Sequence, residues 1–480
     1  MSFASPLFLW FFMPATLLAY WALPRRHRNA VVAAASLLFY TWGAGPHTPQ
    51  LLSAIAVNYG AGLVLGSTRL RDRPRARRGV LLATAGWNLA MLAVWKYAGF
   101  ATEQIDALTG ALGLGDSPIV SLALPIGISF FTFHHLSYVV DVYRGSTPAQ
   151  RSFVRFVTYI AMFPQLIAGP IVRYHEIAGQ LGDTRRDRLG DLAAGFPRFA
   201  LGLAKKVIVA DSLASVVDAA FAHAGGPITT ATAWLGASAY ALQIYFDFSG
   251  YSDMAVGLGL MFGFRLPENF DRPYSAYSVT DFWRRWHVSL SRWFRDYVYL
   301  PLGGNRGGAA KTYRNLLIIF VLCGFWHGAD WTFLVWGLYH GALLVAERLL
   351  GWDRPPGTAW ALALRRGMTL LLVVVGWVFF RAESMTGAWG MLHAMVIWQP
   401  GELDEFAAFA AGHQRMIIFA LALVVVALPA SSPALGPLIQ ADQGPAAVRL
   451  ARAAVTWVAA PYAAVLVAAG TFSPFLYYQF

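Results

Sequence analysis

The sequence comprises 480 residues, of which 57% are hydrophobic and 13% are charged, and its formal net charge at pH 7 is +12. Soluble domains carry about 25% charged residues, so this composition excludes a soluble globular protein and indicates a polytopic membrane protein. The positive charge does not indicate nucleic-acid binding, because the arginines cluster in short loops between apolar runs. Cys323 is the single cysteine, which excludes an internal disulfide.

The first half of the chain is predicted to cross a membrane five times, at 5–23, 30–42, 51–66, 79–95 and 120–142. Arginines follow the first, third and fifth spans, with six of them between Arg69 and Arg78. The loop after the second span is uncharged, and the loop after the fourth contains Glu103 and Asp106. Because basic loops face the cytoplasm, the N-terminus is predicted to face outside. No basic region precedes the first span, so it does not resemble a cleaved signal peptide.

The apolar runs that follow are interrupted by proline, glycine and charge. They lie near 152–172, 193–222, 229–248 and 252–264. In "YIAMFPQLIAGPIVRY", the breaks fall at Pro164, Gly169 and Pro170. Irregular backbone at membrane depth is tolerated only where it is buried in protein or lines a wet cavity. Re-entrant segments are therefore predicted here.

Clearer spans resume at 315–323, 332–350, 368–380, 416–428 and 453–469. The sequence thus predicts an all-α, polytopic fold of about 10–12 membrane helices plus re-entrant segments. We expect one integral membrane domain over 1–480, because no polar block is long enough for a soluble domain. Within it, 1–143 would form the N-terminal spans, 144–350 the catalytic core and 351–480 the C-terminal spans.

The densest polar segment is "DFWRRWHVSLSRWFRDYVYLPLGGNR", residues 281–306. Its helical stripe of apolar and aromatic residues comprises Trp286, Leu290, Trp293 and Tyr297. A basic amphipathic helix at the membrane interface would explain most of the arginines. That interpretation does not explain His287, which follows the first tryptophan directly. The "PLGGNR" turn with Arg306 could meet an anionic group such as a phosphate, although two glycines and an arginine are a weak signal.

His327 lies in the apolar stretch "CGFWHGADWTFLVWGLYHG". An unpartnered buried imidazole costs roughly 1–3 kcal/mol, so this side chain either bonds a neighbouring helix or serves a function. Ionisable residues in membrane segments often mark substrate or proton paths, and neutral imidazole is a common general base. A continuous helix would place Cys323 and Asp330 beside His327. Asp330 could orient the ring or could face water at a helix end.

The other histidines give weaker signals. His340 lies thirteen residues after His327, off its helical face, and is interpreted as structural or secondary; the pair His134–His135 stays uncertain in the same way. Neither HExxH nor CxxC spacing occurs, so no metal site is predicted.

Several ordered blocks resemble the membrane-bound O-acyltransferase superfamily, and within it the alginate O-acetylase type. They are "LPIGISFFTFHHLSYVVDVYRG", "FPQLIAGPIVRY", "LGLAKKVIVADSLA", "YALQIYFDFSGYSDMAVGLGLMFGFRLPENFDRPY", the 281–306 segment, "FWHGADWTFLVWGLYHG" and "SPFLYYQF". The resemblance implies a multi-helix fold with a central tunnel. An acyl thioester would enter it from the cytoplasm and an acceptor from the outer face. The family's two histidines correspond to His327 and His287.

This resemblance assigns roles to the residues. His327 would be the general base that activates a sugar hydroxyl against the thioester carbonyl. His287, Asn269 or a tryptophan N–H would stabilise the oxyanion, with Asp330 as a further supporting residue. Donor phosphates would meet residues of the basic segment: Arg284, Arg285 and Arg306. The donor would be acetyl-CoA or another acyl thioester, such as a phosphopantetheinyl carrier protein, with no bound cofactor.

The resemblance also implies a multi-pass protein of the bacterial inner membrane that O-acetylates an extracellular or periplasmic polysaccharide such as alginate. Its partners would be the acceptor polymer or periplasmic acetyltransferase proteins, and membrane lipid, but not nucleic acid. The related D-alanyl transfer to teichoic acid from a carrier protein is the alternative. A transporter without chemistry is a third reading, although the pseudo-symmetric halves common in transporters are not found in this sequence.

One geometric prediction follows from the shared tunnel. The rings of His287 and His327 should lie within roughly 15 Å of each other, about three helical turns, and should face one cavity. The broken segments around Pro164–Pro170 and Pro267–Pro273 should line that cavity.

Overall fold

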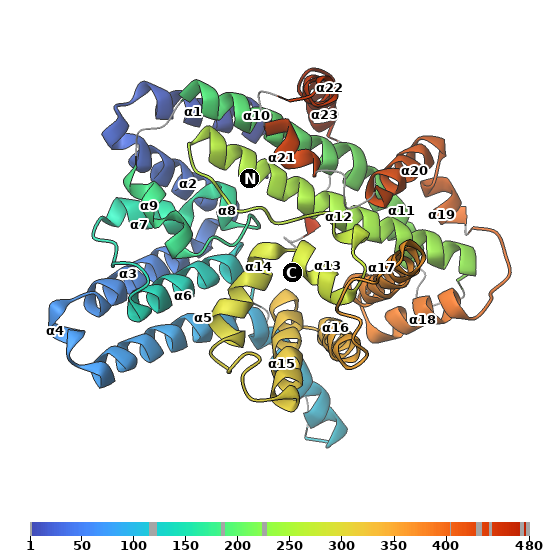
Figure 1. The fold of residues 1–480 in the computed structure, drawn as a ribbon, viewed down its shortest axis with the longest axis horizontal. Helices are drawn as coiled ribbons and strands as arrows, with labels where there is room; N and C mark the ends of the chain where they lie inside the picture. The colour runs from blue at the N-terminus through green and yellow to red at the C-terminus, as the bar shows by residue number, and fades with distance from the viewer. Residues whose placement is uncertain are drawn as a thin grey trace. The chain divides into compact units, whose positions relative to one another are not determined.

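The computed structural model describes residues 2–114, 122–183, 188–222, 228–403, 405–428, 434–440, 444–470 and 475–476. Every regular element within these ranges is helical (Figure 1). The predicted all-α fold is therefore confirmed. The first residues of the predicted span 120–142 lie outside the described residues, and its helix begins at Ile128.

The chain packs as two compact units. Unit 1 comprises Leu7–Leu192 and Leu258–Pro267, and unit 2 comprises Ser2–Pro6, Ala193–Gly257 and Glu268–Phe480. The expectation of one membrane domain, divided at 143/144 and 350/351, stays a prediction.

Unit 1 contains the first predicted spans. Its helices are α1 (Met13–Ala22), preceded by a π-helical turn (Phe8–Phe12), α2 (Arg28–Ala44), α3 (Thr48–Leu65), α4 (Thr68–Arg71), α5 (Pro74–Ala111), α6 (Ile128–Arg144), α7 (Phe153–Ala161), α8 (Phe163–Leu166) and α9 (Tyr174–Gly182). Helices α3, α5 and α6 lie side by side (Figure 1). Between α3 and α5, the buried amides of Asn58 and Asn88 donate to each other at 3.0 and 2.8 Å. The two side chains thus satisfy each other inside an apolar interface.

The predicted break around Pro164 is present in unit 1. Helix α7 ends at Ala161, the short α8 covers Phe163–Leu166, and no regular helix resumes before Tyr174. The side chains from Phe163 to Val172 are buried. Irregular backbone is therefore enclosed by protein here, as the membrane environment requires.

Unit 2 contains the remaining helices. They are α10 (Arg188–Ala204) from Ala193 onward, α11 (Asp211–Ala222), α12 (Thr230–Met261) up to Gly257, α13 (Val279–Arg285), α14 (Val288–Phe294), α15 (Ala309–His327), α16 (Trp331–Leu349), α17 (Ala359–Arg381), α18 (Met385–Val396), α19 (Glu405–Ala410), α20 (His413–Ala427), α21 (Leu435–Gln440), α22 (Ala446–Ala454) and α23 (Ala460–Ala468). Helices α15 and α16 form an antiparallel pair (Figure 1). This pair carries His327.

Helix α12 corrects one expectation. The runs 229–248 and 252–264 were predicted as separate segments, but a single helix spans Thr230–Met261. The glycines that suggested an interruption serve helix packing instead. At Gly257, a side chain would collide with the backbone of α10 at Phe199, so the glycine allows the two helices to approach closely.

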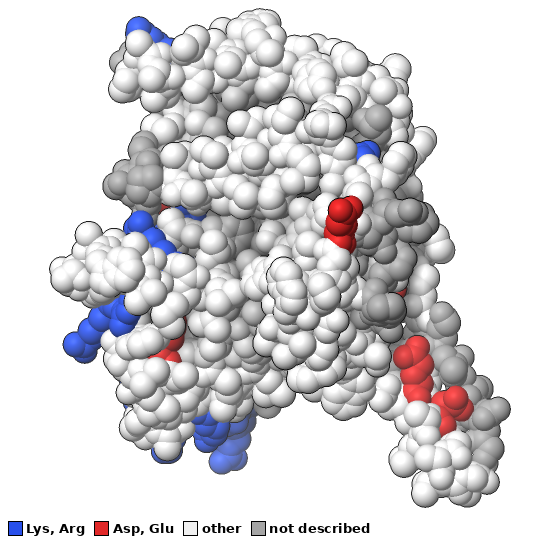
Figure 2. Space-filling view, turned by 90° about the vertical axis from the view of Figure 1, so that its right-hand side faces the viewer, with Lys and Arg blue, Asp and Glu red and all other residues white. Residues whose placement is uncertain are grey.

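Among the described residues, three helices are long and apolar enough to cross a membrane: Pro74–Ala111, Ala359–Arg381 and Ala446–Ala468. The helices Phe8–Ala22 and His413–Ala427 are apolar but shorter. Charged side chains are sparse on the face drawn in Figure 2, as expected of a surface that contacts lipid. The protein is therefore an all-α membrane protein, whereas the number of 10–12 membrane helices and the central tunnel stay predictions.

Candidate active site

His287 lies at a break between two short helices. Its φ of 45° and ψ of 53° place it in the left-handed region, which few residues other than glycine adopt. The continuous helix predicted through Trp286 and Tyr297 is therefore wrong. The 269–271 segment causes the break: its Asn269 carbonyl accepts the Val288 N–H at 3.0 Å, and its Asp271 N–H donates to the Arg285 carbonyl at 2.9 Å.

The apolar stripe of this segment packs against protein, and its location at the membrane interface stays a prediction. Trp286, Leu290 and Trp293 are only 1%, 2% and 5% exposed, so the aromatic stripe packs inside unit 2. The Trp286 ring stacks on Phe282 at 5.6 Å. The two short helices therefore form part of the protein core, and they place His287 there too.

Asn269 fixes the tautomer of His287. Its Oδ1 accepts the backbone N–H of Ser289 at 3.2 Å and the Ser289 hydroxyl at 2.9 Å, while its Nδ2 donates to Ser252. Because Oδ1 is thereby identified as the acceptor, the Nδ1 of His287, 3.1 Å away, must carry the proton. The Nε2 of the neutral ring then holds a lone pair. Neutral His287 can accept a hydrogen bond at Nε2 but cannot donate one to an oxyanion there.

His327 is the last residue of α15 and is 3% exposed. Its ring packs edge-on against three aromatic rings, with centroid distances of 4.7 Å to Trp326, 5.1 Å to Trp336 and 5.0 Å to Phe380. The apolar setting that the sequence indicated is therefore present. Such rings exclude water from the imidazole and hold it in a defined orientation.

The structure corrects the expected position of Asp330. The helix does not continue through this residue, because α15 ends at His327 and the backbone of Gly328 is extended. Asp330 is instead the N-cap of α16, where its Oδ1 accepts the Thr332 N–H at 2.8 Å. Its carboxylate thus stabilises the start of the helix that packs on α15.

The two histidines lie close together in unit 2. The centroid of the Trp326 ring is 6.1 Å from that of His287 and 4.7 Å from that of His327. The centroids of the two imidazoles therefore lie at most about 11 Å apart. The separation is thus within the predicted limit. Trp326 packs against both rings, and the expectation of one cavity that both histidines face stays a prediction.

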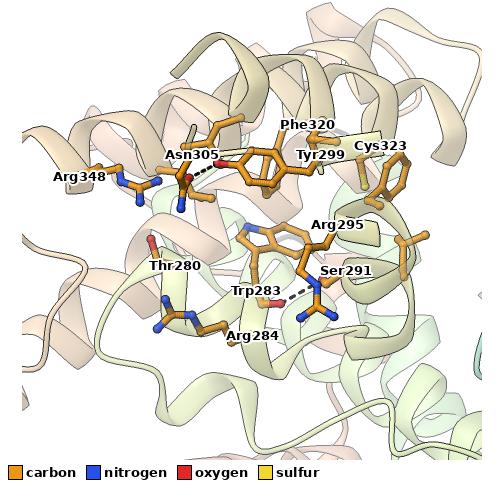
Figure 3. Close-up of a pocket in the computed structure, with 15 residues that line it drawn as sticks. Thr280, Trp283, Arg284, Ser291, Arg295, Tyr299, Asn305, Phe320, Cys323 and Arg348 are labelled. Carbon is orange, nitrogen blue, oxygen red and sulfur yellow. Dashed lines mark hydrogen bonds between the residues drawn. The ribbon is translucent and has the colours of Figure 1, made fainter. Parts of the chain in front are cut away.

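A pocket of about 310 Å³ ends one helical turn from His327 (Figure 3). Its apolar walls comprise Trp283, Leu290, Phe294, Leu316, Ile319, Phe320, Cys323 and Leu344. We call it the Cys323 pocket. Cationic and polar side chains surround it: Arg284, Arg295, Asn305 and Arg348 are exposed, and Tyr299 is half-buried. In Figure 3, Arg284 and Arg348 lie on one side of the pocket and Cys323 on the opposite side.

The predicted donor-binding arginines occupy three different settings. Arg284 lines the Cys323 pocket. Arg285 points elsewhere, with its Nε donating to Asp281 at 3.0 Å. Arg306 is exposed in the turn that supplies Asn305 to the pocket. Arg295 and Arg348 were not predicted, because no local sequence pattern connects them with Arg284.

Three further histidines considered in the sequence, His134, His135 and His340, are fully buried. In unit 2, Nδ1 of His340 accepts the indole N–H of Trp283 at 3.4 Å, so His340 contacts a wall of the Cys323 pocket. In unit 1, His134 and His135 lie within α6, with ring centroids 5.8 Å from Tyr159 and 6.3 Å from Phe156 respectively. The interpretation of His340 as structural or secondary stays a prediction, and the roles of His134 and His135 stay open.

Sequence reasoning also missed a buried ionic cluster in unit 2. The Nζ of Lys206 is 2.7 Å from carboxylate oxygens of both Asp211 and Asp247. Arg198 pairs with Asp253 and with Glu268 at 2.6 Å each. The charges in "LAKKVIVAD" were the available signal, because ionisable residues in an apolar block need partners.

Comparisons with known proteins agree with these observations. A model of the membrane-bound O-acyltransferase family matches residues 123–354. A probable alginate O-acetylase AlgI of Azotobacter vinelandii is 44% identical over 89% of this chain and 84% of the relative. The corresponding protein of Pseudomonas putida is 42% identical over the full length of both chains. A teichoic acid D-alanyltransferase of Bacillus subtilis is 28% identical over 54% of this chain and 69% of the relative.

The matched region contains the break at His287, the Cys323 pocket and the α15–α16 pair with His327. The resemblance drawn from the sequence blocks is thereby confirmed. Together, the family match and the extended identity to its relatives show that the chain belongs to the membrane-bound O-acyltransferase family and is an O-acyltransferase.

Proposed function

We propose that the protein takes an acetyl group from a cytoplasmic thioester donor and passes it across the inner membrane for O-acetylation of a polysaccharide such as alginate. The acceptor polymer, or a periplasmic acetyltransferase protein that serves it, would approach from the outer face. One observation carries the proposal: an apolar pocket with arginines around it ends at Cys323, one turn before His327 in the same helix. The chain is 42–44% identical to probable alginate O-acetylases, which supports acetyl as the group transferred.

The Cys323 pocket suits the thioester arm of the donor. Its volume of about 310 Å³ and its apolar walls would accept an uncharged arm and exclude water. The exposed guanidinium groups of Arg284, Arg295 and Arg348 would bind phosphates of the donor. Acetyl-CoA and a phosphopantetheinyl carrier protein both present phosphate next to such an arm.

His327 would act as the general base. As the acceptor hydroxyl attacks the thioester carbonyl, the imidazole takes its proton and the new C–O bond forms. The tetrahedral intermediate then collapses, the C–S bond breaks, and the proton passes from the imidazolium to the departing thiolate. The rings of Trp326, Trp336 and Phe380 keep competing water away from the base.

Trp336 is the best-placed donor for the oxyanion. Its indole N–H is buried and has no hydrogen-bond partner among the described residues, and its ring lies 5.1 Å from His327. His287 suits a different role, because its tautomer presents a lone pair at Nε2. Because the attacking hydroxyl gives its only proton to His327, we propose that His287 accepts a hydrogen bond from a neighbouring hydroxyl of the acceptor. D-alanyl transfer has weaker support, since the teichoic acid relative is more distant.

The single cysteine allows a direct test of the donor pocket. In membranes that contain the protein, methyl methanethiosulfonate should modify Cys323, and acetyl-CoA or acetyl-phosphopantetheine should slow the modification. Cys323→Ser provides the unlabelled control. If neither thioester protects Cys323, the pocket does not bind the donor.

The proposed reaction is tested in cells. A strain that lacks the gene should regain polymer-bound acetate when it expresses the wild-type protein but not His327→Ala at an equal membrane level. Normal acetate in the variant would refute the role of His327.

A further inference from the structure

One face of helix α16 contacts three separate parts of the site. Trp336, His340 and Glu347 are spaced i, i+4 and i+11, so they lie along the same side of the helix. Trp336 packs on His327 at 5.1 Å, and His340 accepts the indole N–H of Trp283 at 3.4 Å. Near its C-terminal end, α16 presents Glu347 to the start of α13. The same helix therefore contacts the base, a pocket wall and the helix that carries that wall.

Glu347 completes the N-terminal cap of α13. Its Oε1 accepts the Val279 N–H at 2.5 Å, and its Oε2 accepts the N–H and the hydroxyl of Thr280, both at 2.8 Å. The next N–H, of Asp281, donates to the Ser278 hydroxyl. The first three N–H groups of the helix therefore all have hydrogen-bond partners, and two of the three donate to Glu347 on α16.

Helix α13 needs such support because it has only seven residues. Helices this short are unstable unless tertiary contacts hold them. Glu347 is 9% exposed and His340 is fully buried, so both contacts are shielded from water. The His340 ring also packs closely against helix α17, because a side chain at Gly376 would collide with it.

The position of α13 determines the shape of the Cys323 pocket. Trp283 forms one of its apolar walls and Arg284 lies at its cationic side (Figure 3). The opposite wall belongs to α15, through Phe320 and Cys323. A shift of α13 along α16 would therefore widen or close the pocket between α13 and α15.

We propose that Glu347 and His340 are positioning residues that set α13 on α16 and so give the Cys323 pocket the shape that binds the thioester donor. This inference rests on the proposed function of the pocket. Neither residue lines the pocket, and neither needs to contact the donor. Their effect is exerted through Trp283 and Arg284, so it concerns donor binding more than the chemical step.

The test measures donor kinetics and Cys323 reactivity in the full-length protein. Glu347→Ala should raise the KM for the donor about tenfold while kcat changes less than about threefold, because the pocket shifts but His327 does not. The modification rate of Cys323 by methyl methanethiosulfonate should change in parallel. Glu347→Gln should have a milder effect, since its amide oxygen still accepts one N–H. Glu383→Gln is the control, because that side chain is 92% exposed.

His340→Phe provides an independent variant of similar size. It removes the acceptor for Trp283, so it should raise KM and alter Cys323 reactivity in the same direction as Glu347→Ala. Unchanged KM and unchanged reactivity in both variants would overturn the proposal, as would a fall in kcat alone. If Glu347→Ala does not reach the membrane, Glu347→Gln and His340→Phe decide the outcome. Failure of a thioester to protect wild-type Cys323 would instead refute the donor pocket itself.

Discussion

Asn269 and His287 form a hydrogen-bonded pair that fixes the chemistry of the imidazole. Asn269 Oδ1 accepts from Nδ1 of His287 at 3.1 Å while it also accepts the N–H and the hydroxyl of Ser289. The pair connects the 269–271 segment to the break between α13 and α14. Partners of this kind orient a functional histidine and select its tautomer.

Replacing Asn269 should therefore impair turnover. We expect Asn269→Leu to lower kcat by about 10–100-fold, by analogy with the loss of hydrogen-bond partners of metal-ligating histidines. Asn269→Asp keeps an acceptor for Nδ1 and should retain much more activity. The measurement is acetyl transfer at saturating donor with equal amounts of protein in the membrane. Equal loss in both variants would show that the acceptor at this position does not matter.

His327→Ala should yield a folded but inactive protein. Loss of the general base should reduce acetyl transfer by about 10²–10⁴-fold. The aromatic rings around position 327 remain, and the substitution removes a buried polar group, so insertion should survive. Polymer-bound acetate and the membrane level of the variant are measured together, with Glu383→Gln as the control because that side chain is 92% exposed. An inactive variant that is absent from the membrane would contradict the expected folding.

Arg284 and Arg285 should differ although they are adjacent. Arg284→Gln should raise the KM for the donor, because that side chain lines the Cys323 pocket. Arg285→Gln should leave KM close to the wild-type value, because its guanidinium donates to Asp281 and to the Asp271 carbonyl. Initial rates over a range of acetyl-CoA concentrations distinguish the two. An equal rise in KM for both would indicate a general effect of positive charge instead of a defined pocket.

The sequence predicted those features that depend on local pattern. Apolar runs predicted the helices, Pro164–Pro170 predicted buried irregular backbone, and the imidazoles of His287 and His327 were expected to lie near each other. The continuous helix through His287 was wrong because periodicity reports only neighbours in the chain. The break depends on hydrogen bonds to the 269–271 segment, about twenty residues earlier, which periodicity does not contain.

The Cys323 pocket could not be predicted for the same reason. Its lining residues come from α13, α14, α15 and α16, from the π-helical turn Arg295–Tyr299 and from the turn that contains Asn305. Glu347 and Arg348 lie at the C-terminal end of an apolar helix, where charged side chains usually contact water and an arginine also suits the helix dipole. Only the packing of α13 against α16 places Arg348 beside the pocket and lets Glu347 cap α13.

The last prediction concerns the asparagine pair in unit 1. Asn58 and Asn88 exchange hydrogen bonds at 3.0 and 2.8 Å between α3 and α5, and both are fully buried. Asn88→Leu should destabilise the protein, because it leaves the Asn58 amide with one partner fewer in an apolar interface. Replacing both by leucine should cost less than the sum of the two single changes. Side-chain hydrogen bonds between membrane helices contribute about 0.6 kcal/mol on average and up to about 1.7, so the coupling should fall in this range. Unfolding of the four proteins in detergent, analysed as a double-mutant cycle, measures it. Strictly additive single effects would mean that the two amides contribute independently and that their mutual bonds do not stabilise the α3–α5 interface.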